Sequence, residues 1–288
     1  MSASLVWRHA RGTMDCSRGR LVGIVNANPD SFSDGGASAG YELAVEHGHR
    51  LAEAGADVVE VGGESLRFSD HTPVETEIAR VAPVVERLAA ELDVPVAVDT
   101  FKAPVAAAAL AAGAAIVNDP TGLRDPAMMR AVAATGAGVV MTHMFGPPKV
   151  RPAVFPDGDV VARITAWLRG QVEAADAAGI AGERIVVDPG LGLGTAPAQD
   201  LDLLHRIGEV VALGRPVLVP ISNKKVLGTL TGAAASERLA ETAAGLVWCR
   251  TRGAALFRVH DVAFLRRTLT VADAMAAGSA QRWYEVAK

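Results

Sequence analysis

The sequence predicts an α/β protein of the (β/α)8 type, a closed TIM barrel in a single domain. Three observations lead to this prediction. Short apolar runs alternate with helix-forming stretches along the chain. Eight such pairs follow one another, and each takes about 25–40 residues, as in barrels of this type. Each apolar run ends in polar residues or glycine, at the point where a parallel strand would reach one face of the barrel.

The apolar runs are short, rich in Val and Ile, and bounded by turn residues, which is typical of strands buried on both faces. We expect the strands over residues 21–27, 58–63, 95–100, 115–120, 138–144, 185–190, 216–222 and 255–261. We expect the intervening helices at 40–54, from 74, at 102–112, from 126, at 158–179, 198–210, 236–252 and 262–276.

Local signals at the helix ends support these bounds. Gly55 has the residue type expected just after a helix, and Asp125-Pro126 is a typical N-cap and first position. Ser236 is the expected N-cap of the seventh helix. The alternative architecture is an open doubly wound sheet. No G-x-G-x-x-G follows the first strand, which weakens that alternative.

Composition limits the class of protein. The chain has 288 residues, half of them hydrophobic, and a net charge of −4 without runs of like charge. This balance disfavours nucleic acid and membrane surfaces as partners. Cys16 and Cys249 lie far apart, and the first residues lack the apolar segment of a signal peptide. We therefore expect a cytoplasmic protein with an N-terminal lead-in, residues 1–20, and a barrel, residues 21–288.

Polar side chains at the strand ends are the candidate functional residues. They are Asn26, Glu64, Asp99, Asn118, Asp119, His143, Asp188, Ser222, Arg258 and His260. Singly, most have a structural explanation: Asp99 as an N-cap, Asp188 as a turn former, His143 as a buried hydrogen-bonded ring. Their recurrence at the same place in eight repeats predicts a site at the carboxyl end of the barrel.

The residue types indicate two kinds of ligand group. Arg67, Arg258 and His260, beside the Asn26 amide, suit a phosphate or pyrophosphate, and the Asn26 oxygen suits a Mg²⁺ ion bridging phosphate oxygens. Arg258 is equally compatible with an ion pair to Asp99 or Asp188.

The other polar ends suit a flat heterocycle. Carboxylates and amides accept adjacent N–H and NH2 groups, as Asp99, Asn118 and Asp188 would, and Lys224 would bond a ring carbonyl. No Ser-His-Asp or Cys-His arrangement is apparent. Catalysis would consist mainly of drawing charge onto a leaving phosphate group.

These motifs, in this order, resemble the dihydropteroate synthase family over nearly the whole chain. Eight sequence blocks of the family have counterparts in this chain. Residues 26–36 are similar to N-x-T-P-D-S-F-S-D-G-G, residues 62–67 to G-G-E-S-T-R, residues 98–102 to V-D-T-x-K and residues 118–119 to N-D. Residues 142–146 are similar to M-H-M-x-G, residues 188–194 to D-P-G-x-G-x-G, residues 222–224 to S-R-K and residues 258–261 to R-V-H-D.

The resemblance implies a transferase of folate biosynthesis. Such an enzyme condenses 6-hydroxymethyl-7,8-dihydropterin pyrophosphate with p-aminobenzoate or a related aryl amine and releases pyrophosphate. It also implies Mg²⁺ as cofactor, small-molecule substrates and a homodimer formed through helices late in the barrel.

Residue roles follow from the matching positions. The resemblance assigns pterin binding to Asp99, Asn118, Asp188, Lys224 and Arg258. It assigns pyrophosphate binding to Asn26, Arg67, Arg258 and His260, with Asn26 also at the metal. It assigns acceptor binding to Pro29, Phe32, Leu66, Phe68 and Ser222. The catalytic set is Asn26, Asp34, Arg67, Lys224, Arg258 and His260.

Departures from the family pattern gather on the acceptor side. They are Asn28, Leu66, Phe68, Thr142, Leu193, Thr195, Pro220, Asn223 and Lys225. The pterin and pyrophosphate positions all match. We therefore predict a divergent synthase with weak or altered use of p-aminobenzoate. The alternative is a non-catalytic or neofunctionalised pterin-binding paralogue. A methyltransferase barrel is a third alternative, which the SFSDGG loop and the Arg-Val-His-Asp block disfavour.

Overall fold

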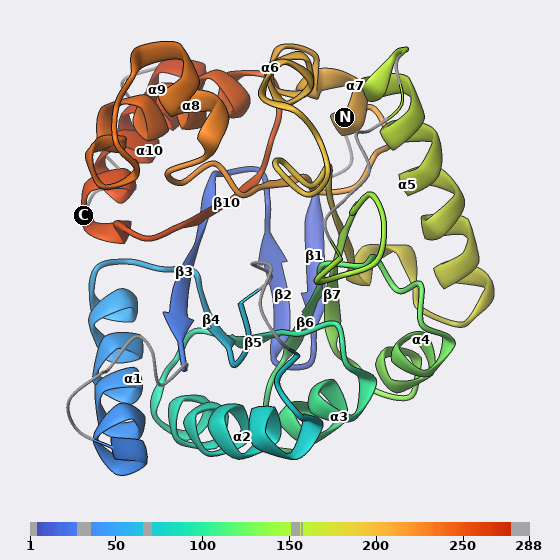
Figure 1. The fold of residues 1–288 in the computed structure, drawn as a ribbon, viewed down its shortest axis with the longest axis vertical. Helices are drawn as coiled ribbons and strands as arrows, with labels where there is room; N and C mark the ends of the chain where they lie inside the picture. Colours follow the sequence, from blue (N-terminus) through green and yellow to red (C-terminus); the bar gives the residue numbers. More distant parts are fainter. Residues whose placement is uncertain (1–4, 28–35, 66–70, 151–155, 157, 278–288) are drawn as a thin grey trace.

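A ring of parallel strands surrounded by helices forms the body of the molecule (Figure 1). The computed structural model describes residues 5–27, 36–65, 71–150, 156 and 158–277. In these residues the eight-stranded sheet has the order β8-β7-β6-β5-β4-β3-β10-β9. Its strands are β3 (Arg20–Asn26), β4 (Val58–Gly62), β5 (Val96–Asp99), β6 (Ile116–Asp119), β7 (Gly138–Thr142), β8 (Ile185–Asp188), β9 (Leu218–Val219) and β10 (Leu256–Val259).

The sheet closes on itself between its first and last strands. Val187 of β8 and Val217, just before β9, form a parallel bridge, and the Val187 N–H donates to Pro216 O at 3.0 Å. The closure confirms the single-domain (β/α)8 barrel and excludes the open doubly wound sheet.

Helices occupy the intervals between the strands. They are α1 (Gly36–Glu53), α2 (Val74–Glu91), α3 (Ala103–Ala111), α4 (Pro126–Ala133), α5 (Val160–Ala177), α6 (Pro197–His205), α7 (Ile207–Val211), α8 (Lys225–Thr231), α9 (Leu239–Thr251) and α10 (Val262–Ala277). The predicted Asp125 cap is confirmed, since its carboxylate accepts the Ala127 N–H at 2.8 Å. No helix in the described ranges is long and apolar enough to cross a membrane.

Two helix predictions were wrong in detail. The helix expected over 198–210 is divided at Arg206 into α6 and α7. Ser236 does not cap a helix: it lies in a 3-10 turn, and α9 begins at Leu239. The cause is Arg238, whose guanidinium reaches back to the carbonyls of Asn223 and Ala233 and holds this segment as a turn.

A hairpin that the sequence analysis did not resolve covers the amino end of the barrel. Strands β1 (Val6–His9) and β2 (Gly12–Asp15) pair antiparallel. Trp7 of β1 is fully buried, and its indole N–H donates to Arg184 O at 3.0 Å. The amino-end cluster is the set of buried residues around it: Trp7, Met14, Cys16, Val22, Val58, Ala97, Ala115, Ile116, Val140, Val186, Leu218, Ala255 and Leu256.

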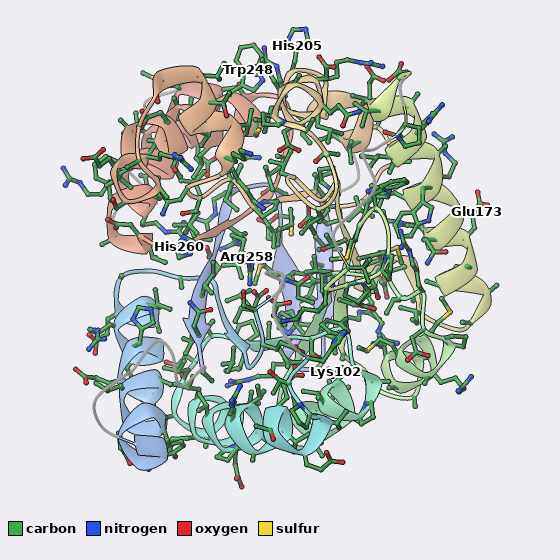
Figure 2. All side chains as sticks on the ribbon, in the orientation of Figure 1. Lys102, Glu173, His205, Trp248, Arg258 and His260 are labelled. Atoms are coloured by element: carbon green, nitrogen blue, oxygen red, sulfur yellow. The ribbon has the colours of Figure 1, made fainter. Side chains whose placement is uncertain are left out.

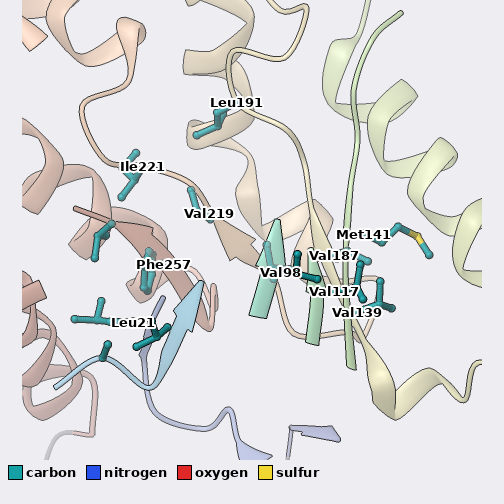
Figure 3. Close-up of a cluster of buried hydrophobic side chains, with 14 of the residues drawn as sticks. Leu21, Val98, Val117, Val139, Met141, Val187, Leu191, Val219, Ile221 and Phe257 are labelled. Atoms are coloured by element: carbon teal, nitrogen blue, oxygen red, sulfur yellow. The ribbon is translucent and has the colours of Figure 1, made fainter. Parts of the chain in front are cut away.

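Strand alternation separates two kinds of buried residue. Outward-facing strand residues, such as Val98, Val139 and Phe257, pack in the larger cluster with the helices (Figure 3). Inward positions begin with the amino-end cluster and turn polar towards the carboxyl ends of the strands. This inner polar layer consists of Glu60, Asp99, Asn118, Thr142, Asp188 and Arg258. The barrel therefore delivers polar side chains from six strands to one level.

Candidate active site

Arg258 of β10 joins two carboxylates of the inner polar layer. Its Nε donates to Glu60 Oε1 at 2.5 Å and its Nη2 to Asp99 Oδ2 at 2.6 Å. Glu60 is 1% exposed. Of the two alternative ion pairs considered for Arg258, the one with Asp99 is present, and its other partner is Glu60, which the sequence did not suggest. The guanidinium from β10 is thereby held in the interior of the barrel by carboxylates from β4 and β5.

Asn118 continues the same chain of contacts. Its Nδ2 donates to Glu60 Oε2 at 2.9 Å. The Thr142 hydroxyl lies between the next two groups, 3.5 Å from Asn118 Oδ1 and 3.4 Å from Asp188 Oδ2. The six side chains of the inner polar layer thus form one connected network from Asp99 to Asp188.

The loop after β8 holds Asp188 and Lys224 in place. Asp188 Oδ1 accepts the Gly190 N–H at 2.7 Å. Gly190 has a φ of +78°, and a Cβ there would lie 1.7 Å from His143 O, so only glycine fits. Lys224 Nζ donates to Leu191 O at 2.5 Å. Both polar groups are therefore positioned by backbone atoms of one loop.

Asn26, Ser222 and His260 lie above this layer, at the outer end of their strands. Ser222 Oγ is 2.8 Å from His260 Nδ1. Partial removal from water, then the charges of Arg258 and Lys224 and of His47 on α1, lower the pKa of His260. Asn26 is exposed at the end of β3. Figure 2 shows Arg258 and His260 inside the ring of helices, with His205 and Trp248 on the outer rim.

Burial dominates the electrostatics of the layer. It raises the pKa of Asp188 to about 6, and it raises the pKa of Asp99 to about 7 against the lowering effect of Arg258. Burial also lowers the pKa of Lys224, while Asp188 opposes that shift. Three carboxylates, from Glu60, Asp99 and Asp188, face two cations here. The layer is therefore suited to a ligand that brings N–H donors or positive charge.

Two strand-end residues, Asp119 and His143, make contacts with neighbouring parts of the fold. Asp119 accepts hydrogen bonds from Thr121 and from the Leu123 N–H, which shapes the loop after β6. His143 packs edge-on against Trp167, with ring centroids 5.0 Å apart. Burial, then the charge of Arg124, lowers the pKa of His143 to about 4. Asp119 and His143 therefore both make contacts that hold the strand ends in place.

A second charged cluster lies beside the site. Lys102 Nζ donates to Glu64 Oε2 at 2.6 Å and to Glu77 Oε2 at 2.7 Å. Lys149 Nζ lies 3.1 Å from Glu64 Oε1, and its side chain is 2% exposed. These contacts tie the segments after β4, β5 and β7 together.

Several predicted residues lie outside the described part of the chain. They are Asn28, Pro29, Phe32, Asp34, Leu66, Arg67 and Phe68. The roles assigned to them remain predictions.

Sequence reasoning missed Glu60 and gave Thr142 no role. It considered strand ends, whereas Glu60 stands in the middle of β4. A carboxylate within a run of valines was the available signal, because the alternation of a barrel strand directs every second residue inward.

No group of three or more His, Cys, Asp or Glu side chains in the described residues is arranged to hold a metal ion. The Asn26 amide oxygen is a hard ligand on the exposed end of a strand. It fits a Mg²⁺ ion that takes most of its ligands from substrate phosphates and water.

Comparison with known proteins identifies similar chains. Residues 22–260 match the family described as pterin binding enzyme. The chain is 37% identical to the dihydropteroate synthase of Escherichia coli over 278 residues, 96% of this chain and 99% of that protein. It is 46% identical to a probable bifunctional folylpolyglutamate synthase/dihydropteroate synthase of Haloferax volcanii, covering 84% of this chain but only 29% of that protein. It is 40% identical to inactive dihydropteroate synthase 2 of Mycobacterium tuberculosis, covering 88% and 81%.

Solved structures give the same similarity. The dihydropteroate synthase of Xanthomonas albilineans with 4-aminobenzoic acid has a TM-score of 0.86 and 43% identity, covering 92% of this chain and 96% of that one. The complex of the Xanthomonas albilineans enzyme with 7,8-dihydropteroate has a TM-score of 0.81 and 41% identity, with the same coverage.

Proposed function

This chain belongs to the dihydropteroate synthase family, and on that premise we propose that its inner polar layer binds and activates the dihydropterin substrate. The chain is a transferase of folate biosynthesis. Its reaction condenses 6-hydroxymethyl-7,8-dihydropterin pyrophosphate with p-aminobenzoate or a related aryl amine. The observation that carries the proposal is the connected network of six inward side chains, with paired acceptors held by buried partners.

The pterin is recognised through its adjacent ring N–H and NH2 groups. The Asp188 carboxylate accepts from two such donors, and the Asn118 amide oxygen accepts from a third. Lys224 Nζ donates to the ring carbonyl, a bond that takes the place of its contact with Leu191 O. The excess of carboxylates supports a ligand with several donors.

The pyrophosphate lies above the ring, where Asn26, Arg258 and His260 reach the same end of the barrel. Arg67 joins them by family assignment. The Asn26 amide oxygen would hold Mg²⁺, which would neutralise part of the phosphate charge when bound. In the first step the bond from the pterin methylene carbon to the pyrophosphate oxygen breaks, and its electron pair leaves on that oxygen. The Arg258 guanidinium stabilises this charge, and the His260 ring donates a hydrogen bond to it.

The amine then completes the transfer. Its nitrogen lone pair forms the new bond to the methylene carbon, and the nitrogen then gives up one proton to the released pyrophosphate or to water. Before that bond forms, positive charge resides on the pterin. The carboxylates of Asp99 and Asp188 stabilise it in a site with little water. Ser222, together with Pro29, Phe32, Leu66 and Phe68, is assigned to the acceptor side.

A pyrophosphate-release assay tests this function. The protein is mixed with the dihydropterin pyrophosphate, Mg²⁺ and a panel of aryl amines, with EDTA in a parallel series. We expect release that depends on an amine and falls when EDTA removes Mg²⁺. Calorimetric binding of the pterin without release for any amine would instead identify a non-catalytic pterin-binding protein, the class named inactive among the relatives.

We also propose that two copies associate through α9 and α10. These helices lie together on one side of the barrel (Figure 1). Phe264, Val271 and Met275 line a shallow groove there, and Met275 is 77% exposed. An exposed apolar surface of this kind is typical of a protein interface. Val271→Glu should give a monomer in analytical ultracentrifugation, and Leu43→Glu on α1 should leave the dimer intact.

A cytoplasmic location remains a proposal as well. Cys16 and Cys249 are both buried and free. Burial raises the pKa of each thiol to about 12. Unpaired buried thiols are the usual state in a reducing compartment.

A further inference from the structure

We infer that Glu60 is a positioning residue, whose buried carboxylate sets the orientation of both the Asn118 amide and the Arg258 guanidinium towards the substrate. The inference rests on the proposed function and extends it to a residue that is buried beneath the ligand groups. It explains why a charged side chain occupies the middle of an otherwise apolar strand.

The geometry places one oxygen of Glu60 on each partner. Oε1 accepts from Arg258 Nε at 2.5 Å, and Oε2 accepts from Asn118 Nδ2 at 2.9 Å. In the order of the sheet, β3 separates β4 from β10, and β5 separates β4 from β6. The carboxylate therefore spans the interior of the barrel and links two elements that do not pair with each other.

For Asn118, the contact decides which end of the amide meets the ligand. An ionised carboxylate only accepts hydrogen bonds, so the group that faces Glu60 must be the NH2. The amide oxygen is then directed towards the Thr142 hydroxyl, which also contacts Asp188. The ligand meets an acceptor at this position, beside the acceptors of Asp188.

For Arg258, the contact fixes the plane of the guanidinium. Nε is held by Glu60 and Nη2 by Asp99, so rotation about the last side-chain bonds would break one bond or the other. The remaining nitrogen, Nη1, keeps a fixed direction. A planar donor held by two carboxylates is preorganised for a planar ligand or an anionic oxygen.

Glu60 itself does not act on the substrate. Both of its oxygens are engaged, and it is 1% exposed. Its contribution passes through Asn118 and Arg258. Its loss should therefore weaken pterin binding and turnover without changing the affinity for the amine.

Glu60→Gln is the first variant for the test. The glutamine keeps the shape but has one donor end, so it cannot accept from both Asn118 and Arg258. We expect the affinity for a dihydropterin, measured by calorimetry, to fall about 10- to 100-fold. The KM for dihydropterin pyrophosphate should rise by a similar factor. The KM for p-aminobenzoate should stay within about twofold of the wild-type value, because Glu60 positions no residue assigned to the amine.

A reciprocal double variant makes the test specific. In Glu60→Gln with Asn118→Asp, the glutamine NH2 donates to the new carboxylate, and its carbonyl accepts from Arg258. The net charge is that of the wild type, and an acceptor oxygen still faces the ligand. We expect this double variant to bind the dihydropterin at least about fivefold more tightly than Glu60→Gln alone, because the bond between the two side chains is restored.

Asp273→Asn is the matched control. Asp273 is a buried carboxylate that pairs with Arg250 and with a backbone N–H at the amino end. It should lower the thermal unfolding midpoint and leave pterin affinity unchanged. Wild-type pterin affinity in Glu60→Gln, or no recovery in the double variant, would overturn the inference. Binding is measured without turnover, so a wild type that releases no pyrophosphate would refute the proposed function but not the role of Glu60.

Discussion

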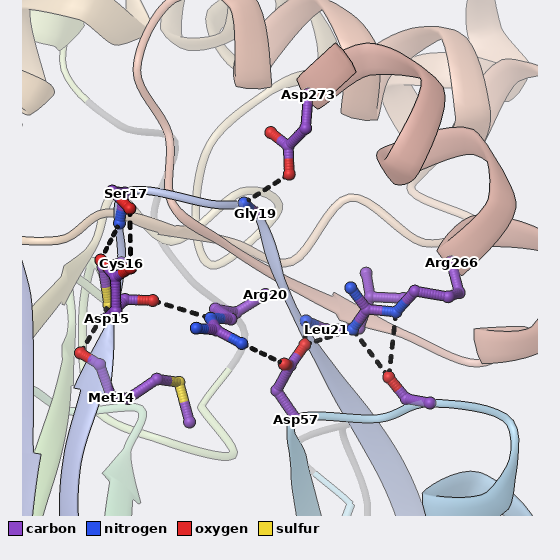
Figure 4. Close-up of polar contacts among 11 residues, drawn as sticks. Met14, Asp15, Cys16, Ser17, Gly19, Arg20, Leu21, Asp57, Arg266 and Asp273 are labelled. Carbon is purple, nitrogen blue, oxygen red and sulfur yellow. Dashed lines mark hydrogen bonds and ion pairs between the residues drawn. The ribbon is translucent and has the colours of Figure 1, made fainter. Parts of the chain in front are cut away.

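The two ends of the barrel use buried charges in opposite ways. At the amino end, Asp57 is bonded by Arg20 at 2.7 Å, by the Leu21 N–H at 2.8 Å and by Arg266 (Figure 4). At the carboxyl end, Glu60 and Asp99 share the single guanidinium of Arg258. One carboxylate has two cations at the first end, whereas two carboxylates have one cation at the second.

The difference shows which end is built for stability. The amino-end carboxylates are satisfied by cations and backbone N–H groups, and they join β3 to its neighbours and to α10. The inner polar layer at the carboxyl end keeps hydrogen-bond acceptors whose donors would come from a bound ligand. Burial raises the pKa of Asp99 and Asp188 there. Buried polar groups without full compensation weaken the folded state. The site is therefore expected to be held at a cost in stability that the amino end offsets.

Trp7→Ala should produce the largest effect and should act on stability alone. The indole is fully buried in the amino-end cluster and bonded to Arg184 O. Its loss should lower the free energy of unfolding by about 3–5 kcal/mol. Urea denaturation measures this loss. The kcat/KM of the remaining folded enzyme should be unchanged, and a fall in kcat/KM beyond threefold would break the separation of the two ends.

Arg258→Lys should have the largest effect on activity. Lysine keeps the positive charge beside Glu60 and Asp99 but cannot hold both carboxylates in the fixed fork of a guanidinium. We expect kcat/KM for the dihydropterin pyrophosphate to fall about 10²- to 10³-fold.

Arg250→Lys is its counterpart at the amino end, where Arg250 pairs with Asp273 at 2.5 Å. It should reduce stability slightly and leave the steady-state kinetics of the wild type. Equal losses of activity in the two lysine variants would show that the ends do not differ in function.

Asp188→Asn should show, through the pH dependence of the free energy of unfolding, how much stability the buried carboxylate at the carboxyl end costs. The pKa of Asp188 is raised from 3.8 to about 6, so the folded protein holds this proton more tightly than the unfolded chain does. Stability from this group is therefore present at low pH and is lost as pH rises through about 6.

We expect the free energy of unfolding of the ligand-free wild type, minus that of Asp188→Asn, to fall by about 1–3 kcal/mol between pH 4 and pH 6 and then to level off. Urea titrations at each pH measure this difference. A difference that rises with pH, or that stays constant, would contradict the raised pKa.

Ser222→Ala should have the smallest effect. The Ser222 hydroxyl is bonded to His260 Nδ1 at 2.8 Å near the solvent-facing end of the strands. Stability should change by less than about 0.5 kcal/mol, as for most surface substitutions. The kcat/KM should fall about two- to fivefold, because His260 loses a group that orients its ring. A loss above tenfold would move Ser222 into the part of the site that binds pyrophosphate.

The sequence was sufficient for the fold class and for most strand positions. Eight valine-rich runs, each followed by a helix, admit few architectures, since parallel strands need helical crossovers. Helix ends were predicted where the signal is local, as at Asp125. They were wrong at Ser236, where Arg238 binds backbone carbonyls that are distant in sequence.

The sequence predicted those site residues that have a suitable residue type and stand at the end of a predicted strand. Asp99, Asn118, Asp188, Lys224 and Arg258 were identified from the sequence, and they meet at one end of the barrel. Asp99 was considered as a partner of Arg258, but Glu60 was not, because the contacts across the barrel depend on closure of the sheet. Glu60 is 198 residues from Arg258 and 58 from Asn118, and no local pattern joins them.

The sequence by itself determined the barrel, the family and the set of polar residues that the strands carry, because period-two alternation and local turn chemistry are properties of short segments. The tertiary structure alone decided which carboxylate holds which cation, which pKa values are raised, and that Trp7 closes the amino end. These outcomes depend on distance and burial, which arise only when strands far apart in the chain are brought around one axis.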